Sequence, residues 1–452
     1  MSAQAQPLRP EVLPAEDWTF PTPVEHALPN GLRALVLDVP GQYVVSVRLT
    51  LPLPLRAEPV AKEGVAWIMA RLLDEGTEQH HQRELSEMLE RRGIAIGAGM
   101  SEAALGVDLD VPQRFLGEAL ELMTEIVSAP AFAESEVSRA VRTRLQDIEQ
   151  ERASAAHRAM REYAATYYDP ATRASRPGAG SAATVSSITR EDVVAFHSEH
   201  VHPRGGTVVV AGDLTDVDVT PLLERTLGSW VTDGPAQAWT REPAPRADDA
   251  ARVVLVDRPG SVQSELIVAT SGPDRRATDW PAFPVLGYLV GGAPNARIDA
   301  VLREEKGYTY GIRSGFRPRQ VGGTFLVTGS VRADATVDSL RLLDEILRGV
   351  GEGVTEDEAR AGIDFMTLTA PGRYDTADAL ADELSHLAAD ELPLTFTSDT
   401  VAAMRRLTPA DLDAAWREHV GREWTIVVVG DASAYRDDVE TLGLGPVTVV
   451  PA

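Results

Sequence analysis

The chain has no cysteine, only two lysines, and no apolar run long enough to cross a membrane. Without cysteine it can form no disulfide, thiolate nucleophile or cysteine-type zinc site, which suits a reducing compartment. A membrane span needs about 18–20 apolar residues in succession, and the N-terminus lacks the basic and then apolar order of a secretory signal. These absences predict a cytoplasmic protein without a membrane partner. Lys62 and Lys306 are the only lysines, and this preference for arginine favours a bacterium with a GC-rich genome.

The chain is strongly acidic, because 43 basic and 68 acidic residues give a formal net charge of −25. Such a field repels a phosphate backbone unless a local basic patch overrides it, and the sequence has no such patch. Nucleic acid is therefore not an expected partner. The length of 452 residues and the 44% hydrophobic content predict two to four domains with sizeable cores.

Three segments of the first half recur in the second half at an offset of about 219 residues. The pairs are Ile188–Val201 with Leu407–Val420, Thr207–Asp213 with Thr425–Asp431, and Leu35–Gly41 with Leu255–Gly260. An offset this long exceeds any solenoid period and indicates a duplicated domain. Proline, glycine and charge replace periodic apolar residues across Thr232–Ala250, so we predict an N-terminal domain at residues 1–235, a linker at 236–250 and a C-terminal domain at 251–452.

Periodic patterns within each half predict the fold class. Val44–Leu51 and Leu105–Val111 are typical of strands, whereas Phe115–Val127 places apolar residues at helical spacing. Hairpin-like strands grouped with paired helices predict an α+β fold, in which each domain is a largely antiparallel sheet with helices packed on one side. Neither a Gly-x-Gly-x-x-Gly segment after a strand nor a Gly-Lys-Ser/Thr phosphate loop occurs, which disfavours a doubly wound nucleotide-binding fold.

The segment Gly64–Thr77, GVAWIMARLLDEGT, is predicted to be an amphipathic helix that ends at a glycine. One stripe of this helix is apolar and faces the core, and it consists of Val65, Ile68, Met69 and Leu72. The other stripe has the same spacing and consists of Trp67, Ala70, Arg71 and Asp74. Zinc peptidases place two ligands and a base at i, i+3 and i+4 of such a helix. Indole, methyl and guanidinium groups cannot supply that chemistry.

This segment resembles the active-site segment of the insulinase, or pitrilysin-type, zinc peptidases, in which a glycine lead and a Gly-Thr exit bracket an inverted His-x-x-Glu-His motif. In register, Trp67 and Arg71 stand at the positions of the two His ligands, and Ala70 stands at that of the catalytic Glu. The third ligand of the family is a Glu on a later helix, and Gln146 aligns best with it, with Asp147 and Glu149 as near misses. The resemblance therefore implies no zinc site and no cofactor in this chain.

A second segment, Gly291–Tyr310, begins with a glycine pair and is predicted to continue as a helix, with Ile298, Val301 and Leu302 facing inward. We expect the helix to stop at Gly307 and a strand to follow at Tyr308–Ile312. From the residues alone, Arg303 could contact the last helical carbonyls and the tyrosines could be ordinary strand residues.

The end of this segment resembles the Arg-x-x-x-Gly-x-x-Tyr signature in the second domain of the same family. The matching residues are Arg303, Gly307 and Tyr310. Gly291 and Gly292 resemble the glycine-rich segment that approaches substrate in the non-metal subunit of the mitochondrial processing peptidase. In the family, the Arg and Tyr are thought to bind substrate backbone and the developing oxyanion.

The resemblance covers the chain from Leu28 to Asp431 and implies half of a clam-shell chamber. It implies the non-catalytic, substrate-binding subunit of a heterodimeric zinc metalloendopeptidase that cleaves short unfolded peptides, leader peptides among them. A homologous partner with an intact His-x-x-Glu-His would supply the zinc, and Arg303 and Tyr310 would complete its active site. The alternative is a scaffold of the same fold, like the core proteins of respiratory complexes. A solo enzyme with a relocated metal site is disfavoured, because nothing replaces three ligands at once.

The histidine-rich segment His197–His202 resembles a metal cluster in composition, but its Glu199 is one place out of register for the inverted motif. His419 lies at the end of the corresponding helix in the second repeat. Because a basic residue in the last turn interacts favourably with the helix dipole, we predict a structural role for these histidines. His80 and His81 are predicted to lie in a solvated loop.

Overall fold

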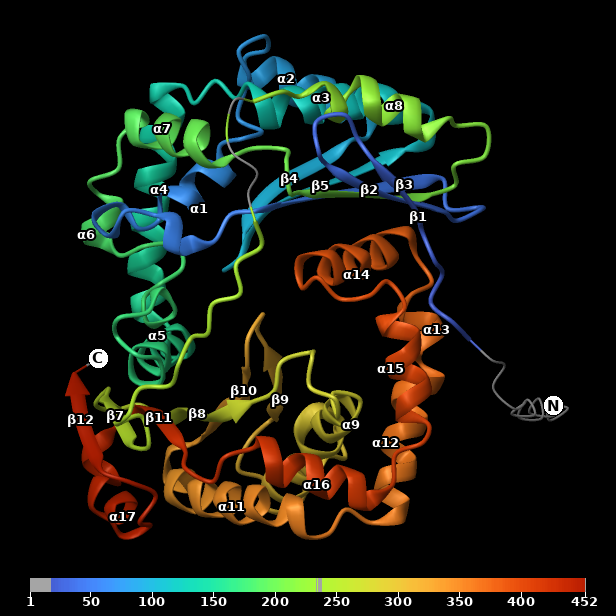
Figure 1. Ribbon diagram of the computed structural model, residues 1–452. Helices are drawn as coiled ribbons and strands as arrows, with labels where there is room; N and C mark the ends of the chain where they lie inside the picture. The colour runs from blue at the N-terminus through green and yellow to red at the C-terminus, as the bar shows by residue number, and fades with distance from the viewer. Residues whose placement is uncertain (1–17, 233, 235–237, 452) are drawn as a thin grey trace, which may run out of the picture.

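Two six-stranded sheets form the framework of the chain, in a computed structural model that describes residues 18–232, 234 and 238–451 (Figure 1). The strand order is β1-β2-β6-β3-β5-β4 in the first sheet and β12-β7-β11-β8-β10-β9 in the second. The first sheet comprises β1 (Val24–Ala27), β2 (Arg33–Asp38), β3 (Val44–Pro52), β4 (Ala95–Met100), β5 (Ala104–Pro112) and β6 (Thr207–Gly212). The second comprises β7 (Val253–Asp257), β8 (Gln263–Gly272), β9 (Ile312–Pro318), β10 (Gly323–Arg332), β11 (Thr425–Gly430) and β12 (Val447–Pro451).

Strand pairing repeats between the halves. β2 lies parallel to β6 as β7 lies parallel to β11, and the next three pairings of each sheet are antiparallel. Only the outermost strand differs, because β1 runs antiparallel to β2 whereas β12 runs parallel to β7. The predicted strands at Val44–Leu51 and Leu105–Val111 are confirmed as β3 and β5. The α+β fold of two homologous domains is therefore confirmed.

The helices of the two halves also correspond, so that α1 and α7 of the first half match α9 and α16 of the second. Those of the first half are α1 (Val65–Arg71), α2 (Gln82–Arg92), α3 (Leu116–Ser128), α4 (Glu134–Ala153), α5 (Ala155–Tyr167), α6 (Ala182–Val185), α7 (Arg190–His200) and α8 (Val219–Arg225). Those of the second half are α9 (Ala282–Gly287), α10 (Arg297–Asp299), α11 (Thr336–Gly349), α12 (Glu356–Leu368), α13 (Ala370–Arg373), α14 (Ala377–Ala389), α15 (Phe396–Met404), α16 (Pro409–His419) and α17 (Arg436–Thr441). The predicted helix at Phe115–Val127 is α3, one residue displaced.

The repeated sequence Thr-x-x-Asp has a local structural cause. Thr189 caps the N-terminus of α7 and forms a capping box with Asp192, and Thr408 and Asp411 do the same for α16. Each threonine hydroxyl accepts a hydrogen bond from the aspartate N–H in the first helical turn, and each aspartate carboxylate accepts one from the N–H of the threonine. The two equivalent helices therefore start at the same point in each repeat.

The repeated Gly-Asp at the end of the central strand joins two turns in each half. Asp213 Oδ2 accepts a hydrogen bond from the Gly41 N–H at 2.9 Å, and Asp431 Oδ2 accepts one from the Gly260 N–H at 2.9 Å. Gly41 has φ +88° and Gly260 has φ +75°, which lie in the left-handed region that favours glycine. The strand and the turn are thus fixed to each other by residues that recur in sequence.

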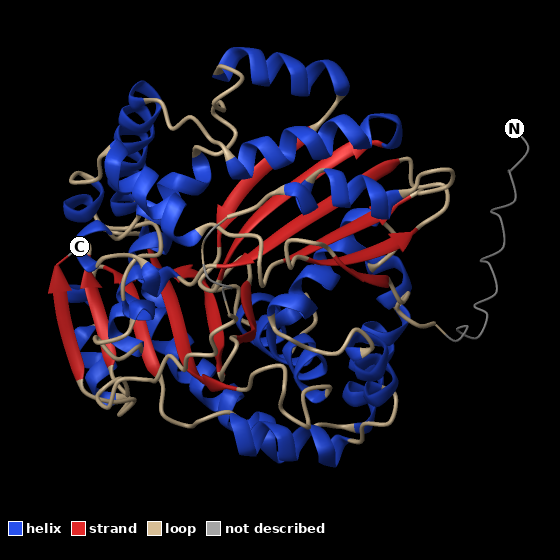
Figure 2. Cartoon of the chain, turned by 45° about the horizontal axis from the view of Figure 1, so that its top comes forward, coloured by secondary structure: helices blue, strands red, loops and turns tan. Residues whose placement is uncertain are grey.

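Each sheet is covered on one face by helices of its own half and on the other face by a helix from the opposite half. Helix α14 of the second half packs on β3 and β6, whereas α5 of the first half packs on β11 and β8. Figure 1 shows α14 lying against the first sheet and α5 beside the second, and Figure 2 shows both sheets between helices. This exchange buries the apolar face that each sheet turns towards the other half, so neither sheet depends on its own helices alone.

Different side chains hold the two exchanged helices. Arg48 on β3 is 6% exposed and donates from Nε to Asp382 Oδ1 of α14 at 2.7 Å. Helix α5 instead ends in the buried rings of Tyr163 and Tyr167, which share an apolar cluster with Val254 and Val427 of the second sheet. Burial raises the pKa of both tyrosine hydroxyls. An ion pair therefore joins α14 to its sheet, whereas α5 is held to its sheet by apolar packing of tyrosine rings.

The predicted boundary between residues 235 and 236 lies outside the described residues. From residue 238 to 250 the chain runs without a helix or an extended strand, apart from a bridge between Arg246 and Tyr168. None of the helices in the described ranges is both long and apolar enough to span a bilayer.

Candidate functional site

Helix α1 is shorter than the sequence predicts, and it ends at Arg71 rather than near Gly76. The N–H groups of Leu72 and Leu73 bond to carbonyls three residues back, so the chain tightens into turns before Gly76. The apolar stripe is confirmed, because its four residues are each at most 1% exposed. The residues at the ligand-like positions therefore lie on a short helix whose opposite face is fully packed.

A buried carboxylate fixes the start of α1. Glu58 Oε1 accepts hydrogen bonds from the N–H groups of Gly64 at 2.8 Å and Ala66 at 3.0 Å. Its second oxygen, Oε2, is 2.8 Å from Nη2 of Arg173. Burial raises the pKa of Glu58, and the bonds to Arg173 and the two N–H groups oppose that rise. Gly64 has φ +104°, and a Cβ there would lie 3.0 Å from Ala179 O, so the glycine lead is required by geometry.

The indole of Trp67 contacts two guanidinium groups. Arg71 lies 5.6 Å and Arg144 lies 5.5 Å from the ring centroid. Arg144 comes from α4, is 4% exposed and pairs with Glu151 at 2.6 Å. Cation–π contacts of this kind contribute about 0.5–2 kcal/mol each, with the larger values in desolvated sites. Packed aromatic and cationic side chains therefore occupy the face on which active members of the resembled family carry the metal.

Zinc does not fit the residues at this position. Ala70, at the place of the catalytic Glu, is 1% exposed and offers only a methyl group. Gln146 lies at the surface, and the α4 residue that contacts Trp67 is Arg144. Two residues along a helix correspond to a rotation of about 200°, so Gln146 points away when Arg144 points in. An indole, a methyl and two guanidinium groups supply no ligand for a dication.

The glycine pair of the second half lies against the edge strand β9. Gly291 and Gly292 end a π-helical turn, η6 (Tyr288–Gly292), that contacts β9. A Cβ on Gly291 would lie 2.5 Å from Ser314 Oγ and 2.8 Å from its backbone N, both on β9. Glycine at position 291 is therefore needed for close packing on β9, whatever it does for a substrate.

The predicted helix after the glycine pair is irregular. It consists of α10 and a second π-helical turn, η7 (Ala300–Glu305), with Ile298 and Leu302 fully buried and Val301 partly buried. The Lys306 N–H bonds to Val301 O, five residues back, and Gly307 has φ +63°. The prediction of a regular helix was thus wrong. The predicted end of the helical segment near Gly307 and its inward-facing residues are confirmed.

The strand predicted at Tyr308–Ile312 is also wrong, because β9 begins only at Ile312. Residues 308–311 form a loop held by other contacts, with the Tyr308 hydroxyl donating to Asp338 at 2.9 Å and the Thr309 hydroxyl to Ser330 O at 2.6 Å. Gly311 ends this loop, and the hydrogen-bonded pairing of β9 with β10 starts at the next residue, Ile312. The matched tyrosine is therefore carried by a loop and not by a sheet.

Arg303 and Tyr310 are the open part of the candidate site. Tyr310 is 95% exposed, and its hydroxyl has no hydrogen-bond partner among the described residues. The Arg303 side chain is 40% exposed and pairs only with its neighbour Glu304, at 3.4 Å. It makes no hydrogen bond to the last helical carbonyls. Both side chains are free to donate to a bound group.

Three acidic and basic residues that the sequence reasoning missed hold this segment. Asp299 is fully buried, and its Oδ1 accepts from the Ile312 N–H at 2.9 Å. Arg297 pairs with Glu358 of α12 at 2.7 Å. The hydrogen bond from Arg297 lowers the pKa of Glu358 to about 2. The sequence shows Arg297 and Asp299 two residues apart, but it does not show their partners, because Glu358 and Ile312 lie further along the chain.

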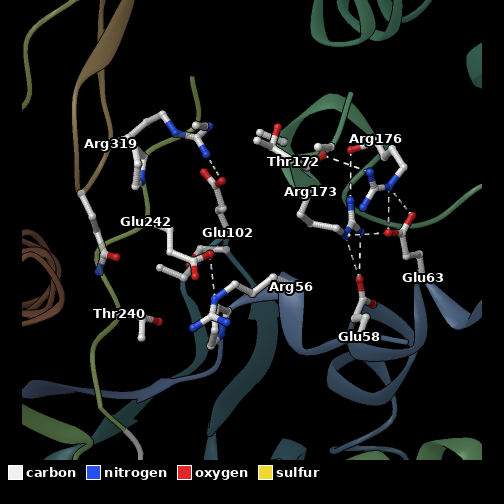
Figure 3. A pocket seen from close by; sticks show the side chains of 18 of the residues that line it. Arg56, Glu58, Glu63, Glu102, Thr172, Arg173, Arg176, Thr240, Glu242 and Arg319 are labelled. Atoms are coloured by element: carbon white, nitrogen blue, oxygen red, sulfur yellow. Dashed lines mark hydrogen bonds and ion pairs between the residues drawn. The ribbon is translucent and has the colours of Figure 1, made fainter. Parts of the chain in front are cut away.

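A cavity of about 620 Å³ lies between the two halves, and the predicted site residues do not line it. Its wall carries four ion pairs, which are Arg173–Glu58, Arg176–Glu63, Arg56–Glu242 and Arg319–Glu102 (Figure 3). Glu102 and Arg319 lie at the tips of the equivalent hairpins β4–β5 and β9–β10. Burial lowers the pKa of Arg319 to about 10, which still leaves it charged at neutral pH. The charges of the wall are thus largely neutralised within it.

Edge strands lie beside both motifs. β4 pairs only with β5 and contacts α1, and β9 pairs only with β10 and contacts the glycine turn η6. An edge strand presents free N–H and C=O groups to an extended peptide. The arrangement is therefore suited to holding a peptide main chain, and the structure brings neither Trp67 nor Tyr310 into the central cavity.

Two histidines of the histidine-rich segment contact main-chain carbonyl oxygens, which is consistent with the predicted structural role. His197 Nε2 lies 3.0 Å from Val127 O and burial lowers the pKa of the ring, while His202 Nε2 lies 2.8 Å from Glu199 O. His80 differs from the predicted solvated residue, because its Nδ1 contacts the carboxylate of Glu125 at 2.9 Å.

The chain consists of two similar α+β halves, each with one six-stranded sheet, and the second half carries an exposed loop with Arg303 and Tyr310. Both halves match models of one known protein family. One family model, described as insulinase (peptidase family M16), matches residues 34–174, and another, described as the peptidase M16 inactive domain, matches residues 187–364. Together they cover more than half of the chain. The chain belongs to the insulinase family, peptidase family M16.

Relatives of similar length extend this likeness over the chain. An uncharacterized zinc protease of Mycobacterium bovis is 23% identical over 449 residues, covering 94% of this chain and 97% of that protein. A probable mitochondrial-processing peptidase subunit beta of Arabidopsis thaliana is 23% identical over 266 residues, covering 58% of this chain and 49% of that protein.

Solved structures show the same fold. A peptidase M16 inactive domain from Pseudomonas fluorescens superposes with a TM-score of 0.83 at 23% identity, covering 90% of this chain and 98% of that one. A chain of complex III from Candida albicans gives a TM-score of 0.75 at 12% identity, covering 93% and 99%. Peptidases and a respiratory complex thus share this fold.

Proposed function

We propose that this chain is the non-catalytic, substrate-binding subunit of a heterodimeric zinc metalloendopeptidase that cleaves short unfolded peptides. The observation that carries the proposal is a contrast within one chain. The position of the metal is filled by Trp67 in contact with Arg71 and Arg144, whereas Tyr310 is 95% exposed and its hydroxyl has no partner among the described residues. A chain of this kind requires a partner to supply zinc and a base.

The partner is a homologous insulinase-type chain with an intact His-x-x-Glu-His, and it carries the zinc. The domains at 1–235 and 251–452, joined by the linker at 236–250, would form one half of the closed chamber. The two His residues of the partner's motif would hold the zinc, which would supply a Lewis acid for the scissile carbonyl and an activated water. In this chain, the Arg303 guanidinium and the Tyr310 hydroxyl donate to the substrate backbone and the developing oxyanion, where fixed donors in a water-poor site are most effective.

The edge strand β4 suggests how a peptide would be held. Its pairing with β5 leaves the other side of the strand without a partner in the sheet, and Gly97 and Gly99 have no heavy atom within 4 Å of an added Cβ. Main-chain pairing gives affinity without reading sequence, which suits short unfolded segments such as leader peptides. We propose that the complex acts in the bacterial cytoplasm.

The test is co-expression with an insulinase-type chain from the same genome that keeps the zinc motif. We expect cleavage of a quenched-fluorescent library of unstructured peptides only when both chains are present. Arg303→Ala and Tyr310→Phe should each lower kcat by about 100- to 1,000-fold, the range found when one oxyanion donor is removed, with complex formation unchanged.

Two matched variants serve as controls. Tyr308→Phe removes a hydroxyl from the same loop, but that hydroxyl donates to Asp338. Arg360→Ala removes a side chain that is 67% exposed on α12 and pairs with Asp357. Both should cleave at the wild-type rate. A partner that is equally active alone would refute the proposal.

The second candidate is a scaffold without a role in proteolysis. It is favoured by the fold shared with the complex III chain of Candida albicans. In that case the two chains should form a stable complex, yet Arg303→Ala and Tyr310→Phe should leave every measured rate unchanged. The exposed Tyr310 hydroxyl favours the peptidase subunit, because a scaffold gains little packing from a side chain that is 95% exposed.

A further inference from the structure

Three potential metal ligands meet in the second half, where the loop before α9 lies against the end of α16. One ligand atom each from Asp279, Glu418 and His419 lies within 4.8 Å of the other two. Among the described residues, no other group of three or more such side chains meets this distance. The cluster joins segments about 140 residues apart, and the packing of α9 on α16 brings them together.

The contact between His419 and Asp279 differs from an ordinary hydrogen bond. Nε2 of His419 is 3.1 Å from Asp279 Oδ1, yet this buried oxygen accepts no aligned hydrogen bond. The oxygen is therefore close to the nitrogen but off its axis. Zinc lies about 2.0–2.1 Å from a ring nitrogen and about 2.0–2.2 Å from a carboxylate oxygen. If one zinc ion bound both atoms at their separation of 3.1 Å, the Asp279 oxygen would lie roughly 40° away from the lone-pair axis of the His419 nitrogen.

We propose that Asp279, Glu418 and His419 bind one borderline divalent cation, with zinc as the expected ion. One imidazole and two carboxylates match the nitrogen and oxygen ligands that zinc takes, and water completes four-coordination. Calcium and magnesium prefer all-oxygen sites with six or more ligands, which this cluster does not offer. The site is separate from the position on α1 that the family uses.

The surroundings orient the histidine. The ring of Phe283 on α9 meets the His419 ring edge to face at a centroid distance of 5.3 Å. Glu418 is exposed and can turn towards the cation, whereas Asp279 and His419 are partly buried. A bound cation would tie α16 to the start of α9, whose chain continues directly into the glycine turn at Gly291 and Gly292.

The duplication supplies an internal control. His200 is the counterpart of His419 at the end of the equivalent helix α7, and Glu199 is the counterpart of Glu418. Their atoms are 4.0 Å apart, and within the part of the chain that the structure describes no third ligand lies close enough to join them. The first half therefore keeps the helix end without the metal cluster.

The experiment measures zinc binding by the full isolated chain, by equilibrium dialysis with metal analysis and by calorimetry. We expect one zinc per chain in the wild type. Affinity should fall at least about tenfold in Asp279→Asn and Glu418→Gln and be lost in His419→Ala, while His200→Ala binds as the wild type does. Circular dichroism shows whether His419→Ala is folded, and the two conservative variants carry the test if it is not.

Crystals grown with zinc locate the ion independently, by anomalous difference maps at the zinc edge. A peak among the three side chains is expected. A wild-type chain that binds no zinc, a peak elsewhere, or unchanged binding in the variants would each overturn the site. No peptidase assay is involved, so this outcome and that of the proposed function are distinguishable.

Discussion

In the first half, α1 carries Trp67 in contact with two guanidinium groups, whereas in the second half the loop after η7 carries Tyr310 with its side chain almost wholly in solvent. Both residues lie near an edge strand of equivalent topology, β4 in one half and β9 in the other. The first position is a packed structural contact. The second position presents a tyrosine hydroxyl to solvent, where it adds little to packing and is open to hydrogen bonding.

Removing Trp67 should have the largest effect on stability. Trp67→Ala deletes a half-buried ring that packs on the first core and stacks with Arg144, so we expect a loss of about 2–4 kcal/mol in the free energy of unfolding. Urea denaturation measures it. Tyr310→Ala is the matched change in the second half and should stay within about 0.5 kcal/mol of the wild type. Equal losses for both variants would remove the distinction between a packed and an open site.

Gly291→Ala comes next, because a methyl group there overlaps β9. Its Cβ would lie 2.5 Å from Ser314 Oγ and 2.8 Å from the Ser314 backbone N, and overpacking of this kind costs about 1–3 kcal/mol. Gly349→Ala, in α11 with nothing within 4 Å of an added Cβ, should instead be neutral or gain up to about 1 kcal/mol. Thermal unfolding of the pair measures both. A stable Gly291→Ala protein would show that the turn can move away from β9.

The Arg297–Glu358 pair should make the second-half segment sensitive to acid. The hydrogen bond from Arg297 lowers the pKa of Glu358 from 4.5 to about 2. A depressed carboxyl pKa contributes stability that is fully present above pH 4.5 and is lost as the pH falls towards about 2. The advantage of the wild type over Glu358→Gln should therefore shrink across this window in denaturant titrations.

Glu356→Gln is the control for that measurement. Glu356 lies in the same first turn of α12 but is exposed and has no ion pair among the described residues. Its difference from the wild type should vary much less between pH 5 and pH 2. If the stability difference from the wild type changed equally with pH in both variants, the effect would come from negative charge at the helix terminus and not from the pair with Arg297.

Arg71→Ala should have the smallest effect. Arg71 is exposed, so its contact with Trp67 at 5.6 Å is worth about 0.5–1 kcal/mol. Urea denaturation of Arg71→Ala, Trp67→Ala and the double variant forms a cycle that isolates this contact. A coupling energy near zero would leave Arg144 as the side chain that holds the ring.

Much of the fold was predictable because its causes are local. The Thr-x-x-Asp capping boxes of α7 and α16, and the Gly-Asp turns after β6 and β11, recur in sequence and produce the same contacts in both halves. Strands β3 and β5 and helix α3 followed from periodicity. The irregular geometry around Arg303 did not, because π-helical turns have no sequence period of their own and Asp299 is held by a partner on β9.

The candidate site was predictable only in part. The spacing of residues located the ligand-like positions on α1. It could not show that Arg144, and not Gln146, is the α4 residue that faces Trp67, because a shift of two residues turns a helical position to the opposite face. His419 was assigned a structural role, and only the packing of α9 on α16 shows Asp279 beside it.

The sequence by itself determined the duplication, the fold class, and the chemistry missing from α1, since these depend on residue identity and short-range spacing. The tertiary structure decided which side chains meet. It placed α5 and α14 on the opposite sheets, Trp67 in contact with Arg71 and Arg144, and Tyr310 in solvent. Contacts between residues far apart in the chain depend on how whole elements pack, and no local pattern records that packing.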